Sequence, residues 1–171
     1  VFLPVLLSSI PGRSSCDMHP CPVPDLASNP NIVAIMAAVG DLLRVHALLA
    51  LAVPLFALLS CDDVTAAHSF QPGMARLISV GSNVLPGAYR RMCALAAAHE
   101  HDATESWDAR LQPFHDFCGV EPNPIPVKAL LRRIGIGHDL RLPLLPLSAA
   151  HQPAADHLAG DIAALEALSS H

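Results

Sequence analysis

The sequence predicts an α/β fold, namely half of a parallel α/β barrel followed by a helical extension. Four short apolar segments alternate with stretches of helical spacing, and after Asn83 only helical spacing remains. The apolar segments run continuously, which is typical of parallel strands that are covered on both faces. Four strands cannot close a barrel alone. We therefore expect a half barrel of four β/α units over residues 1–100 and a C-terminal helical subdomain over residues 101–171.

Each expected strand is followed by a segment that can form a helix. Asp41 is expected to cap one helix and the Asp62-Asp63 pair another. The expected strands are Val1–Leu7, Asn31–Ala37, Leu55–Leu59 and Ala75–Val80. The expected helices are Val23–Ala27, Asp41 to about Ala52, Asp62 to about Phe70 and, in the tail, Ala88–His99, Thr104–Phe117, Pro126–Ile134 and Ala154–Leu168.

The composition excludes several classes of function. Of the 171 residues, 52% are hydrophobic and 15% are charged, and the formal net charge is -5. The chain therefore has no basic surface for nucleic acid and no polybasic patch for a membrane. Such an apolar chain can bury enough surface to fold, which excludes disorder. The most membrane-like stretch, Ala47–Leu59, is interrupted by Pro54 and falls short of the ~20 residues that a spanning helix needs.

The chain start and the cysteines bear on processing and compartment. Val1–Ile10 is apolar but lacks the charged segment and the cleavage site of a signal peptide, and no Met precedes it, so we expect a fragment or a processed product. The number of cysteines is odd, with no C-x-x-C pair, which fits a reducing compartment. We expect a cytoplasmic protein whose thiols are mostly buried: Cys16, Cys21, Cys61, Cys93 and Cys118.

Six ordered motifs carry a resemblance to one family. They are P-V-L-L-x-x-I-P-x-R-x-x-C-D from Pro4, N-I-V-A-I from Asn31, L-L-S-C-D-D from Leu58, I-S-V-x-x-N from Ile78, E-P-N-P-I-P-V-K from Glu121 and L-R-L-P from Leu140. Over essentially the whole chain they resemble the C-terminal part of dihydrodipicolinate synthase, a TIM (β/α)8 barrel lyase of lysine biosynthesis. The resemblance implies that the four strands are barrel strands five to eight.

The resemblance also implies a pyruvate-dependent reaction whose central residue is replaced. The family condenses pyruvate with aspartate semialdehyde through a Schiff base on a lysine at the end of strand six, and Met36 takes that place. A thioether cannot form an imine, because this chemistry needs an amine. The neighbouring glutamate is Ala37, and the proton-shuttling tyrosine of strand five is Ser8. Cys61 replaces the glycine of the L-S-G-D-D motif and places a side chain at the pyruvate pocket.

Two residues match the binding pattern that the resemblance implies. Arg13 stands in the P-x-R pattern, which in the family binds the semialdehyde carboxylate, and the backbone of Ile78 would line the pyruvate pocket. Strands one to four, which in the family carry the pyruvate-binding threonines, a second tyrosine and the lysine feedback site, have no counterpart in the 171 residues. We expect a small keto acid such as pyruvate as a weak ligand, with no metal and no cofactor.

Several other residues could serve as nucleophiles, metal ligands or acid/base groups, but each has a simpler structural interpretation. Lys128, the single lysine, lies in a tail helix and is interpreted as a solvated side chain. Cys16, His19 and Cys21 offer three soft ligands, whereas structural zinc takes four. The H-E-H-D segment from His99 to Asp102 is interpreted as a polar turn. The Asp62-Asp63 pair favours helix capping over acid/base chemistry, because it lies between a strand and a helix.

The helix from Asp41 to Ala52 is unusually apolar, since its polar residues are only Asp41, Arg44 and His46. Either a partner covers it or it makes the chain adhesive.

The sequence as a whole leaves three functional hypotheses: a truncated, catalytically incompetent family member, a non-catalytic interaction subunit that pairs with a full-length relative, or an enzyme of altered chemistry. The absence of a second lysine counts against the third. Open strand edges also lead us to expect a homo-oligomer or association with such a relative.

Overall fold

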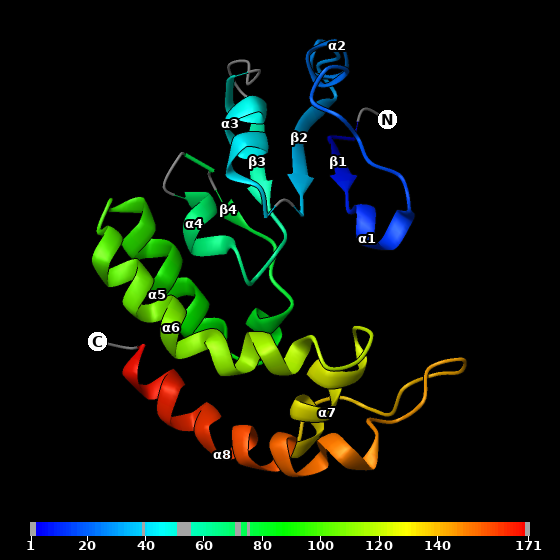
Figure 1. Cartoon of the computed structure of the whole chain (residues 1–171), viewed down its shortest axis with the longest axis vertical. Helices are drawn as coiled ribbons and strands as arrows, with labels where there is room; N and C mark the ends of the chain where they lie inside the picture. The colour runs from blue at the N-terminus through cyan, green and yellow to red at the C-terminus, as the bar shows by residue number, and fades with distance from the viewer. Residues whose placement is uncertain (1–2, 39, 51–55, 71–72, 75, 170–171) are drawn as a thin grey trace. The chain divides into compact units, whose positions relative to one another are not determined.

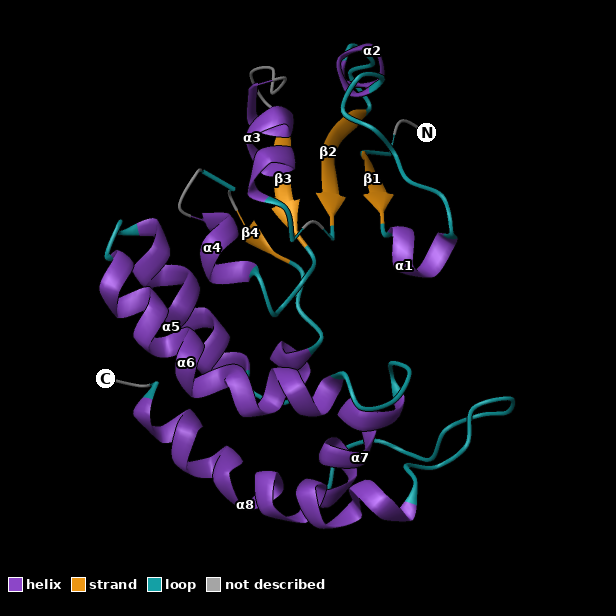
Figure 2. Cartoon of the chain, viewed as in Figure 1, coloured by secondary structure: helices purple, strands orange, loops and turns teal. Residues whose placement is uncertain are grey.

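The computed structural model describes residues 3–38, 40–50, 56–70, 73–74 and 76–169. They belong to two compact units. The first comprises residues 1–78 and 96–101, and the second comprises residues 79–95 and 102–171. Figure 1 traces the chain through both units, and Figure 2 separates the strands of the first unit from the helices that make up the second.

The first unit is built around a four-stranded parallel sheet (Figure 2). Strands β1 (Val5–Ser9), β2 (Ile32–Ala37), β3 (Ala57–Ser60) and β4 (Arg76–Leu77) lie side by side in chain order. Each neighbouring pair is parallel, so each connection crosses from the end of one strand to the start of the next. The connections contain α1 (Pro11–Ser14), α2 (Val23–Ala27), α3 (Leu42–Ala50) and α4 (Ala66–Phe70). The α/β class with a parallel sheet is confirmed.

One face of the sheet carries the apolar core of the first unit. The strand register aligns Ile35 of β2 with Leu58 of β3, and both side chains are almost fully buried. They belong to one cluster with Val23 of α2 and with Val45 and Leu48 of α3. Each such buried aliphatic side chain stabilises the unit by about 1.5–3 kcal/mol relative to an exposed one.

Helix α3 confirms the predicted cap and shows how its apolar residues are divided. The N–H of Leu43 donates a hydrogen bond to Oδ1 of Asp41 at 2.9 Å, which satisfies an amide that has no partner within the helix. Val45 and Leu48 face the core, whereas Leu43 is 79% exposed. Residues 51 and 52 of the predicted helix lie outside the described residues. The first unit therefore covers only part of this apolar helix.

The two outer strands differ from the prediction. β1 begins at Val5, because Pro4 has no N–H to donate and the N–H of Val5 makes the hydrogen bond to the carbonyl oxygen of Asn31 (2.6 Å). β4 has two residues, because Val80 already has helical dihedral angles (φ -78°, ψ -46°). A short 3-10 turn, η1 (Gly81–Asn83), begins directly after it.

The second unit is helical, as predicted. It contains η1, α5 (Pro86–Ala97), α6 (His101–Cys118), α7 (Ile125–Arg133), η2 (Ala149–His151) and α8 (Gln152–Leu168), with the α5–α6 junction at Ala96–His101 grouped with the first unit. None of the described helices combines the length and the apolar character needed to cross a membrane.

A carboxylate of α8 caps the N-terminus of α5. Glu166 accepts hydrogen bonds from the backbone N–H groups of Gly87 and Ala88, each at 3.0 Å. A Cβ atom at position 87 would lie 2.4 Å from Oγ of Ser169 and 2.7 Å from the Glu166 carboxylate. A side chain at position 87 would therefore have to displace the Ser169 hydroxyl and the Glu166 carboxylate, and glycine leaves room for both.

Candidate functional site

The carboxyl ends of the four parallel strands meet along one edge of the sheet, which is where parallel α/β folds place their binding and catalytic residues. Backbone hydrogen bonds continue past the strand ends. The N–H of Cys61 donates to the carbonyl oxygen of Ala37 (3.2 Å), and the N–H of Ile78 donates to that of Ser60 (2.8 Å). Four of the five residues predicted to form the site lie along this edge: Ser8, Met36, Cys61 and Ile78.

Ser8 and Met36 are direct register partners on β1 and β2. Met36 is aligned in turn with Leu59 of β3, and Leu59 with Arg76 of β4. Because side chains alternate along a strand, these four residues form a row on the face opposite the apolar core. Ser8 is exposed and Met36 is half-buried. The row therefore presents a hydroxyl beside a thioether.

Arg76 belongs to this row, although the sequence analysis did not single it out. Its side chain is exposed, and a guanidinium at this position offers a fixed positive charge to a carboxylate. Arg76 lies within the expected strand Ala75–Val80, and this position is the sequence feature from which it could have been predicted as a site residue.

Cys61 follows β3 directly and is half-buried. Burial raises the pKa of its thiol to about 11, and the negative charges of Asp62 and Asp63 act in the same direction. The thiolate is the nucleophilic form of cysteine, so at neutral pH this side chain is an unreactive thiol. Cys61 therefore adds bulk to the edge without adding a nucleophile.

Arg13 and Ile78 are both accessible. Arg13 lies in the last turn of α1, the short helix that follows β1, and its side chain is exposed. Ile78 follows β4 and is 42% exposed, with its N–H engaged by the carbonyl oxygen of Ser60. A guanidinium is suited to binding a carboxylate, and an exposed isoleucine is suited to an apolar contact.

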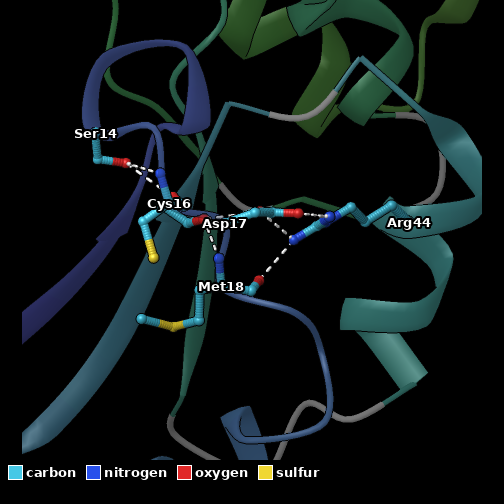
Figure 3. A network of polar contacts seen from close by, with 6 residues as sticks. Ser14, Cys16, Asp17, Met18 and Arg44 are labelled. Carbon is cyan, nitrogen blue, oxygen red and sulfur yellow. Dashed lines mark hydrogen bonds and ion pairs between the residues drawn. The ribbon is translucent and has the colours of Figure 1, made fainter.

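A polar network fixes the loop that leads away from β1 (Figure 3). The guanidinium of Arg44 on α3 donates to both carboxylate oxygens of Asp17, at 2.5 and 2.7 Å, and to the carbonyl oxygen of Met18 at 2.6 Å. This hydrogen bonding holds the pKa of Asp17 below its usual range. The N–H of Met18 donates to Oγ of Ser9 (3.2 Å), and Oγ of Ser14 donates to the carbonyl oxygen of Cys16 (2.8 Å). The network joins α3 to the loop that follows α1 and so limits the movement of that loop.

The comparisons with known proteins decide the family. A sequence model of the dihydrodipicolinate synthetase family matches residues 2–161. The chain belongs to this family. The resemblance read from the six motifs is confirmed.

Curated relatives of the dihydrodipicolinate synthetase family are similar over almost the whole chain. The 4-hydroxy-tetrahydrodipicolinate synthase of Stenotrophomonas maltophilia is 78% identical over 169 residues, which is 99% of this chain and 57% of the relative. That of Xanthomonas axonopodis pv. citri is 61% identical over 168 residues, 98% of this chain and 56% of the relative. The chain thus spans little more than half the length of these relatives.

Solved structures of the family have the same fold. The chloride-inhibited dihydrodipicolinate synthase of Acinetobacter baumannii, solved in complex with pyruvate, has a TM-score of 0.89 at 34% identity and covers 95% of this chain and 56% of its own. The 4-hydroxy-tetrahydrodipicolinate synthase of Methylacidiphilum fumariolicum has a TM-score of 0.91 at 29% identity and covers 100% of this chain and 58% of its own. These TIM-barrel enzymes share the parallel sheet and the C-terminal helices.

The remaining candidate residues of this family member lie elsewhere. Cys16, His19 and Cys21 are exposed. The other three cysteines are half-buried, so the expectation of mostly buried thiols is wrong. The rings of His99 and His101 are 6.3 Å apart between centroids. Among the residues that the structure describes, no three His, Cys, Asp or Glu side chains gather in a group that could hold a metal ion.

The aspartate pair and the lysine have local roles. Helix α4 begins at Ala66, later than predicted, because Asp62 accepts a hydrogen bond from the hydroxyl of Thr65 (2.6 Å) within the preceding turn. Lys128 lies on α7 in the second unit, where Nζ donates to the carbonyl oxygen of Asp139 at 3.4 Å.

Proposed function

We propose that this chain is a dihydrodipicolinate synthase-like protein of the pyruvate-dependent Schiff-base lyase class that cannot carry out the family reaction by itself. The observation that carries the proposal is Met36 on the sheet face beside Ser8. The family chemistry needs an amine that condenses with the keto carbon of pyruvate and a nearby group that moves protons. A thioether can do neither, and a serine hydroxyl is too short to take the place of a phenol.

The surroundings of Met36 support the same proposal. Cys61 is a neutral thiol at physiological pH because its pKa is about 11, so it does not replace the missing nucleophile. It also occupies space at the strand edge where the pyruvate pocket is expected. We therefore expect pyruvate to bind weakly, with Arg13 and Ile78 as its contacts on this chain.

We also propose that the four strands are strands five to eight of a TIM barrel, with residues 1–100 as the half barrel and residues 101–171 as the C-terminal subdomain. The parallel order β1-β2-β3-β4 and the family structures support this assignment. In a closed barrel, the row from Ser8 to Arg76 would face the interior, and β1 and β4 would each pair with a further strand. The odd number of cysteines without a C-x-x-C pair supports a reducing compartment, and we propose the cytoplasm.

A second candidate function is that of a non-catalytic subunit that pairs with a full-length relative. Exposed apolar side chains favour it: Leu6 and Val33 in the sheet are 41% and 39% exposed, and Leu43 on α3 is 79% exposed. An oligomer would cover these side chains.

A coupled assay with the next reductase of the pathway tests the proposal. The chain, the Met36→Lys variant and a double variant that also carries Ser8→Tyr are each measured alone and then co-expressed with the first four β/α units of an active relative. We expect no turnover from any of them alone, and turnover in the co-expressed pair only for Met36→Lys that also carries Ser8→Tyr, because the reaction needs the amine, the proton carrier and the groups that orient pyruvate. Turnover of the unmodified chain, alone or in the pair, would contradict the proposal. Capture of an intact relative by the unmodified chain without turnover would favour the interaction subunit.

A further inference from the structure

A cavity in the second unit lies outside everything assigned to the family reaction. It measures about 390 Å³, and its lining residues come from α7, the start of α8 and the loop that joins them. Figure 1 labels the two helices. Ligand pockets in proteins fall in the range of about 300–1,000 Å³, with mostly apolar walls and a few polar groups. The apolar lining comes from Ile125, Ala129, Leu140, Pro146 and Leu147. The cavity thus has the size and the apolar lining of a small-molecule site.

Three of the six polar residues in the lining are cations. Lys128 and Arg132 are one turn apart on α7, and His138 follows in the loop. Arg133 also lines the cavity, but its guanidinium is committed to Oδ1 of Asp156 (2.6 Å) and Oε1 of Gln152 (2.5 Å). Lys128 and Arg132 are therefore the cations that can accept a ligand.

Asp139 already contacts both cations. Its side-chain carboxylate forms an ion pair with Arg132, while its backbone carbonyl oxygen accepts the long 3.4 Å hydrogen bond from Lys128. The side chains of Arg132 and Asp139 are 57% and 74% exposed. An ion pair as exposed as this contributes little stability, so a carboxylate from outside can compete with Asp139.

We propose that this cavity binds a small organic anion with a carboxylate head and an aliphatic body. In the bound state the carboxylate contacts Nζ of Lys128 and the guanidinium of Arg132, and the aliphatic part lies against Ile125 and Leu147. Without ligand, the carboxylate of Asp139 forms the ion pair with Arg132, and the carboxylate of the ligand replaces it in the bound state. The site rests on the second unit alone and does not depend on the proposed loss of lyase activity.

The single lysine makes the test selective. Reductive methylation with ¹³C-formaldehyde labels Lys128 and the chain's α-amine and retains the positive charge of both. The label is observed by NMR while hexanoate is added. Acetate, which lacks the aliphatic body, and hexan-1-ol, which lacks the charge, are titrated in parallel. We expect hexanoate to shift the Lys128 signal with a Kd on the order of 1 mM, as its few non-hydrogen atoms permit. The α-amine signal should not move.

Two substitutions with opposite effects sharpen the test, measured by calorimetric titration of the unlabelled chain. Lys128→Met should weaken hexanoate binding about tenfold, because one charge-assisted hydrogen bond is lost. Asp139→Asn should tighten binding several-fold, because the competing carboxylate is gone, and a purely structural role for Asp139 predicts no such gain. Arg90→Gln, an exposed cation on α5, is the matched control and should leave the Kd unchanged.

Three results would overturn the proposal. The first is no shift of the Lys128 signal at ten times the expected Kd. The second is equal binding of hexanoate and acetate, which would remove the role of the apolar lining, or equal binding of hexanoate and hexan-1-ol, which would remove the role of the cations. The third is an Asp139→Asn variant, folded by circular dichroism, that binds hexanoate no more tightly than the unmodified chain.

Discussion

Ser8 and Met36 lie directly opposite each other on two adjacent parallel strands, on the sheet face that points away from the apolar core. Strand register fixes this pairing, because a shift of either strand by one residue would turn the side chain on that strand into the core. Ser9 and Ala37, which follow them, are buried at 5% and 2% exposure. The ends of the two strands therefore present a hydroxyl beside a thioether, and we propose that this is the place where the imine chemistry of the family needs an amine and a proton carrier.

The ion pair between Asp17 and Arg44 should make the stability of the first unit depend on pH. The pKa of Asp17 is lowered by its hydrogen bonds from Arg44, so the pair stabilises the fold above the unfolded carboxyl pKa of about 4 and is lost as pH falls through the lower, folded value. Asp17→Asn should reduce the denaturant midpoint at pH 7, and the difference from the unmodified chain should shrink as the pH falls below about 4. Asp25→Asn, an exposed acid on α2, is the control. A difference that stays constant as the pH falls would contradict this account.

The Glu166 carboxylate should stabilise the second unit through the N-terminus of α5. Glu166→Ala removes both 3.0 Å hydrogen bonds from Gly87 and Ala88, and loss of an N-cap costs about 1–2 kcal/mol. Asp161→Ala on the same helix, where the carboxylate is 53% exposed, should change stability little. Urea unfolding followed by circular dichroism measures both variants. Equal midpoints for the two variants would show that the cap contributes nothing.

The Cys61 thiol should resist alkylation at neutral pH. With a pKa of about 11, its thiolate fraction at pH 8 is roughly one in a thousand, against about one in four for an ordinary thiol. Iodoacetamide labelling read by peptide mass spectrometry should modify exposed Cys16 well before Cys61. The Cys61 rate should rise about tenfold per pH unit up to pH 11, and Asp62→Asn should increase it, since one negative charge is removed. Equal rates for Cys16 and Cys61 at pH 8 would refute the raised pKa.

The exposed sheet should make the isolated chain associate. β1 and β4 are the outer strands of the sheet, and the described part of β1 exposes Val5 and Leu6 at 45% and 41%. Open edges beside apolar side chains template association. We expect light scattering to detect oligomers or aggregates of the unmodified chain, and fewer of them for Leu6→Glu. Leu142→Glu, a loop substitution at an 84% exposed position, is the control and should associate more than Leu6→Glu. A compact 18.0 kDa monomer would show that the sheet needs no cover.

Local signals were sufficient to predict much of the fold. The short helix Val23–Ala27 is observed with the predicted bounds, and the Asp41 cap is confirmed by its hydrogen bond from Leu43. Continuous apolar runs located β2 and β3 to within two residues at each end. Such features depend on residues close together in the sequence, so pattern analysis can find them.

Features that depend on distant residues could not be predicted. Arg44 reaches Asp17 across 27 positions, and Glu166 reaches Gly87 across 79. No periodicity in the sequence encodes either approach, since both arise from the way helices pack. The cavity beside Lys128 is a similar case, because the loop that completes it is irregular. The sequence shows that Lys128 is the single lysine, but no pattern in it predicts the cavity that Lys128 lines.

Borohydride trapping with pyruvate tests the central claim most directly. The unmodified chain, alone and in complex with the first four β/α units of an active relative, is reduced in the presence of pyruvate and analysed by intact mass and peptide mapping. Met36→Lys in the same complex is the positive control and should gain one pyruvate-sized adduct at position 36. The account predicts no adduct on the unmodified chain. A pyruvate adduct on that chain, at Lys128 or elsewhere, would show that it retains an imine-forming residue and contradict the account.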